Sequence, residues 1–169
     1  ARLQMSTLTV ASVVLLAVAG WTSRSLYFVW EEWGHLWDAV ESPLWGLLQS
    51  HFGYVSPLGR LLFLLEAKVF GDWYSGYVLV NATLMIAVVF LMWRTLRPSN
   101  PWASWALVGG LIVFLLSAGS LFAVHFAAMD AYFLTWLFGI LALHVWRKSR
   151  SSGLVVLFLL AAALSSTLM

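Results

Sequence analysis

The chain has 169 residues, of which 62% are hydrophobic and 9% are charged, and its mean hydropathy is +0.90. A soluble domain of this size cannot bury so much apolar surface, so this composition predicts a multi-span membrane protein. The absence of cysteine excludes disulfides and thiolate metal sites. The basic residues form no continuous stripe that a phosphate backbone could follow, so nucleic acid is not an expected partner.

The apolar runs predict an all-α membrane protein with about four to five transmembrane helices in one domain, residues 1–169. An uncharged run of about 20 residues can cross a hydrocarbon core roughly 30 Å thick. Gly119 and Ser120, with the residues after them, predict the turn before the fourth span. Because the last run is short and lacks a polar flank, we expect the chain to be part of a longer protein. The predicted spans cover residues 3–23, 73–93, 102–120, 126–146 and 154–169.

The first extracytoplasmic loop, residues 28–72, holds six of the seven carboxylates. A helical period over Glu31 to Gln49 separates an apolar face rich in Trp and Leu from a polar face. Such a pattern is typical of an amphipathic helix in the plane of the membrane surface. Pro43 would interrupt one long helix, so we expect two short ones, the second with Ser42 as its N-cap.

A further interfacial helix is predicted from Ser56, with Pro57 at its first helical position. Charges at the bilayer centre cost about 2.5–3.5 kcal/mol each, so a segment with three charges should lie flat or pack against other helices. Gly71 should end this helix. The charges are Arg60, Glu66 and Lys68, and the predicted apolar side comprises Leu58, Leu61, Leu62, Leu65 and Val69.

The basic residues predict the orientation, because cytoplasmic loops carry an excess of Lys and Arg. Arg2 precedes the first span, Arg94 and Arg97 follow the second, and a basic cluster at 147–150 follows the fourth. All of them fall on one side. We therefore expect a multi-pass protein, in a bacterial inner membrane, with a cytoplasmic N-terminus and an extracytoplasmic acidic loop.

Several short motifs occur in an order known from another group of membrane proteins. They are Val29-Trp30-Glu31-Glu32-Trp33, Val55-Ser56-Pro57-Leu58-Gly59-Arg60, Val69-Phe70-Gly71-Asp72, Tyr77-Val78-Leu79-Val80-Asn81 and Leu121-Phe122-Ala123-Val124-His125. In this order and content the chain resembles the amino-terminal half of the GT-C-type integral-membrane glycosyltransferases, the relatives of protein mannosyltransferases. The chain offers Glu31 and Glu32 where that family opens its outer loop with Asp. It also has about half as many spans as such enzymes.

The resemblance implies transfer of a sugar from a polyprenyl-phosphate donor at the extracytoplasmic face, by inverting displacement. Glu31 or Glu32 would be the catalytic base, and adjacent helical positions point about 100° apart, so only one can face a pocket. Arg60 would bind the donor phosphate, and His125 and Asp130 would lie near the acceptor. We group Asp38 with these substrate-binding candidates, and carboxylates with His35 could hold a divalent cation.

Each assignment has a structural alternative. The two glutamates could be solvated charges on an interfacial helix, Arg60 could reach lipid headgroups, and Asp130 could lie in the headgroup layer. A second function class is a small non-catalytic transmembrane subunit of a larger energy-transducing or photosynthetic complex. A transporter half is a third, disfavoured because the spans lack paired charges and broken midplane helices. The expected partners are the lipid bilayer, the lipid-linked donor and other membrane subunits.

Overall fold

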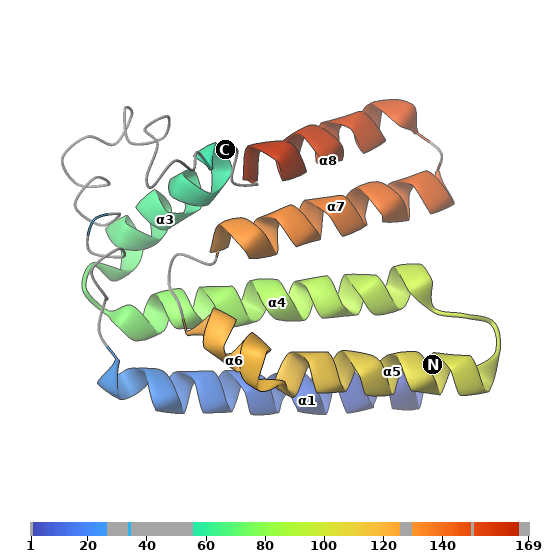
Figure 1. Cartoon of the computed structure of the whole chain (residues 1–169), viewed down its shortest axis with the longest axis horizontal. Coiled ribbons are helices and arrows are strands. Elements are labelled where there is room, and N and C mark those ends of the chain that lie inside the picture. Colours follow the sequence, from blue (N-terminus) through green and yellow to red (C-terminus); the bar gives the residue numbers. More distant parts are fainter. Residues whose placement is uncertain (1, 27–33, 35–55, 126–129, 150, 166–169) are drawn as a thin grey trace.

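The computed structural model of the chain describes residues 2–26, 34, 56–125, 130–149 and 151–165 (Figure 1). Every regular element within these ranges is a helix, which confirms the all-α prediction. Two of the helices, α1 and α4, are long and apolar enough to cross a membrane. The elements are α1 (Arg2–Thr22), η1 (Ser23–Ser25), α3 (Pro57–Phe70), α4 (Tyr74–Leu96), α5 (Pro101–Leu116), α6 (Ala118–Val124), α7 (Asp130–Lys148) and α8 (Ser152–Ser165).

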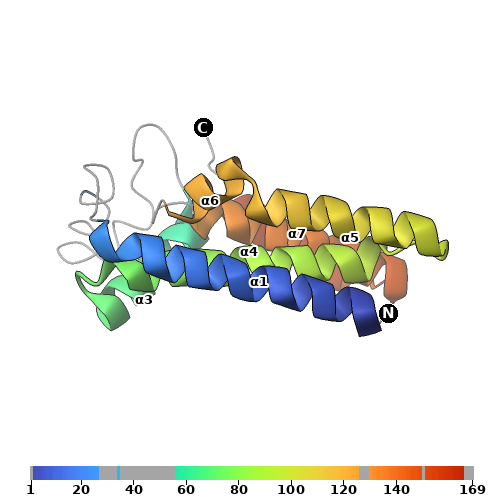
Figure 2. The ribbon, with the colours of Figure 1, turned by 90° about the horizontal axis from the view of Figure 1, so that it is seen from below.

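Four of the helices lie side by side in the order α1, α4, α7, α8, with their axes roughly parallel (Figure 1). Helices α5 and α6 form a second layer over α1 and α4 (Figure 2). Helix α3 packs against α4, α7 and α8 at one end of the row. This arrangement makes α4 the central helix, since it packs against α1, α3, α5, α6 and α7.

The core lies between α1, α4 and α5, where side chains at helical spacing face one another. Leu8 and Leu15 of α1, Met85 of α4, and Val108 and Leu115 of α5 are almost fully buried. Small residues on the same faces let the helix backbones approach closely. These small residues are Ala11 and Ala19 of α1 and Ala82 of α4.

The predicted helix after Ser56 is present as α3, with Pro57 in its first turn. Gly71 ends it, as predicted, with a φ of 58° and a ψ of −118°. The amide of Trp73 donates to the carbonyl oxygen of Phe70 over 3.0 Å, so residues 70–73 form a type II′ turn. That turn reverses the chain directly into α4.

The predicted turn at Gly119 and Ser120 is wrong, because both residues lie inside α6. The third apolar run instead breaks at Ser117, whose backbone is extended with a ψ of 153°. The Ser117 hydroxyl accepts a hydrogen bond from the amide of Ser120 at 3.2 Å and so caps α6. A serine cap of this kind satisfies a free amide at a helix start, which explains why the helix restarts here instead of turning.

The predicted amphipathic helices between Glu31 and Gln49 lie outside the described residues, apart from Gly34.

Candidate functional site

The predicted site residues divide into two groups. Glu31, Glu32 and Asp38 lie outside the described residues. Arg60 is half-buried on α3, His125 directly follows α6, and Asp130 is the first residue of α7. These three positions belong to the same end of the helix row, opposite the chain's N-terminus (Figure 1).

Helix α3 crosses α7 at a point where the two backbones nearly touch. A Cβ atom added to Gly59 would lie 2.6 Å from the Cβ of Ala131 and 3.0 Å from its Cα. Only glycine permits this approach, because real Cβ atoms do not come so close to backbone. Arg60 follows Gly59, and Asp130 precedes Ala131, so the crossing brings these two positions of the chain together.

The start of α3 is also attached to α8. Ser56 occupies the N-cap position, as predicted, but its hydroxyl makes no cap hydrogen bond. The hydroxyl instead donates to the carbonyl oxygen of Ser165 over 2.7 Å. Ser165 is fully buried and is the last described residue of α8. The bond therefore joins α3 to α8 beside Arg60.

Helix α3 buries one of its three charged side chains. Gly59, Phe63 and Glu66 are its buried residues, and the Glu66 side chain is only 3% exposed. The Phe63 ring contacts the Tyr77 ring of α4 with centroids 5.2 Å apart, and Glu66 lies within electrostatic range of Tyr77. Val69, on the predicted apolar side, is 74% exposed. The helix therefore buries a carboxylate and leaves an aliphatic side chain outside.

His125 joins three helices at this end. Its Nδ1 lies 2.6 Å from the carbonyl oxygen of Leu121, and its Nε2 contacts the Thr22 hydroxyl of α1. The Tyr74 hydroxyl of α4 donates to the His125 carbonyl oxygen over 2.6 Å. A carbonyl oxygen only accepts, so Nδ1 must carry a proton.

The hydrogen bond between Nε2 of His125 and the Thr22 hydroxyl can run in either direction. The Thr22 hydroxyl carries one hydrogen, and the carbonyl oxygen of Val18 lies 2.7 Å from the same oxygen. Thr22 donates either to Nε2 or to the Val18 carbonyl oxygen, and in the second case Nε2 donates to Thr22. Both ring nitrogens keep a partner in either arrangement, which suits a structural clamp between α1 and α6.

Among the described residues, no three His, Asp or Glu side chains gather closely enough to hold a metal ion.

The contacts of Thr22, Tyr74 and His125 were not predicted from the sequence. No helical or strand period links them, because they lie at the ends of different apolar runs. The available signal was the predicted orientation, which puts the ends of spans one and three and the start of span two on the same side. Orientation predicts a shared layer but does not select partners within it.

At the opposite end of the helix row, side chains near the C-terminus of α7 make hydrogen bonds to the last turn of α4. The Arg147 guanidinium donates to the carbonyl oxygen of Thr95 over 2.6 Å, and the Thr95 hydroxyl lies 2.9 Å from Nδ1 of His144. Cations near the last carbonyls of a helix are favourable, because those groups carry partial negative charge. The two ends of the row thus differ in chemistry.

No family model, no curated protein and no solved structure matches this chain.

Proposed function

We propose that this chain is a multi-span membrane protein with a GT-C-like glycosyltransferase site at the end that carries α3. The observation that carries the proposal is the close crossing of Gly59 and Ala131, which joins the Arg60 segment to the start of α7. A guanidinium held by rigid helices suits a phosphate, since it makes two parallel hydrogen bonds in a fixed plane. The phosphate in this proposal is that of a polyprenyl-linked sugar.

Membrane insertion is supported by the distribution of exposed aromatic and aliphatic side chains. Trp21 and Trp73 are exposed at the α3 end, while Trp102 and Trp146 are exposed at the basic end. Indole rings at two opposite ends match the two aromatic belts of membrane proteins. Between them lie exposed aliphatic residues, among them Val10, Val13, Val113, Leu157 and Leu160. Helix α4, with 23 residues, is about 34 Å long, enough to cross the hydrocarbon core.

In the proposed mechanism, Glu31 or Glu32 removes the proton of the acceptor hydroxyl, and that oxygen attacks the anomeric carbon of the sugar. The bond from this carbon to the phosphate oxygen breaks, and Arg60 stabilises the departing phosphate. His125 and Asp130 would lie near the acceptor. Asp38 would help to hold the substrate.

The test is sugar transfer by the full chain in liposomes, assayed with a panel of polyprenyl-phosphate sugars. Substituting Arg60→Gln should reduce transfer at least tenfold, because a charge-assisted pair with the leaving phosphate is lost. Arg24→Gln is the matched control, since Arg24 is exposed at the same end and lies over the Trp21 ring. Equal transfer by both variants would contradict the role of Arg60. Full transfer by both Glu31→Gln and Glu32→Gln would remove the proposed base.

One observation favours the non-catalytic subunit as a second candidate. The described hydroxyls of Tyr74 and Tyr77 and both ring nitrogens of His125 have partners within the chain. Such groups hold helices together and leave little to act on a substrate. On this alternative, no sugar donor of the panel supports transfer. After detergent extraction, the chain should purify as a stoichiometric subunit of a larger complex.

A further inference from the structure

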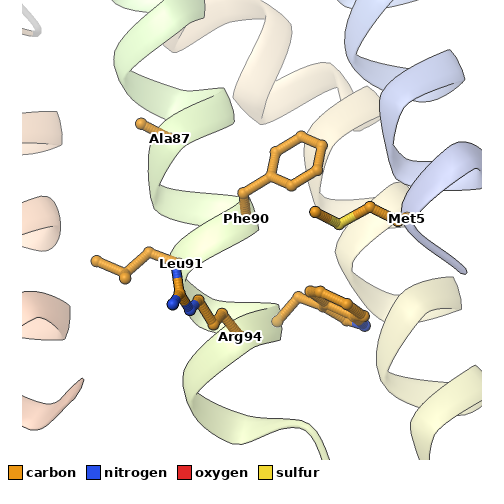
Figure 3. Close-up of a pocket in the computed structure, with 6 residues that line it drawn as sticks. Met5, Ala87, Phe90, Leu91 and Arg94 are labelled. Carbon is orange, nitrogen blue, oxygen red and sulfur yellow. The ribbon is translucent and has the colours of Figure 1, made fainter. Parts of the chain in front are cut away.

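An open groove of about 280 Å³ lies between α1 and α4 near the basic end of the row (Figure 3). Met5 forms its α1 side, and the remaining lining residues come from the second half of α4. The α4 side chains are Ala87, Phe90, Leu91, Trp93 and Arg94. Five of the six lining residues are apolar or aromatic, so the groove accepts a hydrocarbon along most of its length.

Cationic side chains lie beside this groove, and the Arg94 side chain runs back along α4 to Leu91 (Figure 3). Arg94 belongs to the last turn of α4 and lines the groove, and its side chain is exposed. Arg2 precedes Met5 by three residues, so it shares the same face of α1 one turn closer to the end. The Arg97 guanidinium lies over the Trp93 ring, 5.3 Å from its centroid. Positive charge therefore flanks the apolar groove.

Trp93 adds a hydrogen-bond donor to the wall. Its side chain is 7% exposed, and its Nε1 is buried with no hydrogen-bond partner among the described residues. A buried donor without an acceptor costs free energy. An oxygen-bearing ligand in the groove could supply that acceptor.

We propose that this groove binds an anionic glycerophospholipid, with one acyl chain against Met5 and Phe90 and the phosphate on Arg94 and Arg2. The inference rests on the membrane insertion proposed above but not on the glycosyltransferase chemistry. Basic pockets between membrane helices on the cytoplasmic side bind anionic headgroups, and positive residues are expected on that side here. A zwitterionic lipid would bring a second cation beside these arginines and bind less well.

The experiment is native mass spectrometry of the full chain released from detergent after incubation with equal amounts of dioleoyl phosphatidylglycerol and dioleoyl phosphatidylcholine. The wild-type chain should retain phosphatidylglycerol preferentially. Arg94→Gln should weaken its retention about fivefold, the effect of about 1 kcal/mol for one basic side chain. Lys148→Gln is the matched control, because Lys148 is an exposed cation at the same end on α7.

A second pair of variants tests the apolar part without altering charge. Ala87→Phe should fill the groove and lower retention of both lipids, whereas Ala106→Phe, on the exposed surface of α5, should leave both unchanged. Equal retention of the two lipids by the wild type, or equal effects of the two charge variants, would overturn the lipid site. Retention by Ala87→Phe at the wild-type level would do the same.

Extraction of membranes with alkaline carbonate separates this failure from failure of the proposed function. If the wild-type chain is extracted, membrane insertion is wrong and the lipid site falls with it. If the chain resists extraction but shows no lipid selectivity, only the lipid site is wrong.

Discussion

Gly59 and Ala131 stand so close that no side chain larger than hydrogen fits at position 59. Gly59→Ala should therefore lower the free energy of unfolding by about 1–3 kcal/mol, the usual cost of overpacking. Thermal unfolding in detergent measures the change. The control is Gly139→Ala on α7, where an added Cβ meets nothing within 4 Å. There alanine should be neutral or stabilising by up to about 1 kcal/mol, because glycine weakens a helix. Equal loss in both variants would contradict the close crossing.

Gly71 provides a test of backbone conformation alone. Its φ of 58° is rare for residues with a side chain, and an added Cβ would meet no atom within 4 Å. Gly71→Ala should cost about 1–3 kcal/mol through the type II′ turn and not through crowding. Gly119→Ala, inside α6 and likewise in open space, is the control. An unchanged melting temperature for Gly71→Ala would show that α3 and α4 are joined differently.

The Tyr74 hydroxyl links α4 to the end of α6 through the His125 carbonyl oxygen. Tyr74→Phe removes this hydrogen bond and keeps the ring, so we expect a loss of about 0.5–1.5 kcal/mol in the free energy of unfolding. Tyr132→Phe is the matched control, since the Tyr132 side chain is 46% exposed. Hydrogen exchange should also speed up around residues 121–125 in Tyr74→Phe. No difference between the variants would assign Tyr74 a packing role only.

The absence of cysteine makes the chain a ready background for mapping its sidedness. Ser25 and Ser99 are both exposed and lie at opposite ends of the helix row, after α1 and after α4. A membrane-impermeant maleimide applied to intact cells should label Ser25→Cys, while Ser99→Cys should react only after permeabilisation. The reverse pattern would invert the proposed orientation. Labelling of both in intact cells would contradict a membrane-spanning arrangement.

The sequence by itself determined the helical class and most of the helix positions. Apolar runs closed by arginine predicted the helices α1 and α4 closely, because length and charge along one run need no knowledge of neighbours. Local chemistry also predicted the start and end of α3, through Ser56, Pro57 and Gly71. It misplaced the break after the third run, since Ser117 and Gly119 both carry turn signals and only the cap hydrogen bond selects between them.

Only the tertiary structure decided which residues from distant segments meet. The pairing of Gly59 with Ala131, of Ser56 with Ser165 and of Tyr74 with His125 joins segments 51 to 109 residues apart. Such contacts depend on how whole helices cross, and crossing depends on the shapes of many side chains at once. The sequence could place these residues at the same end of the predicted spans, because charge and hydropathy along the chain set where each apolar run begins and ends. It could not choose which residues at that end become partners.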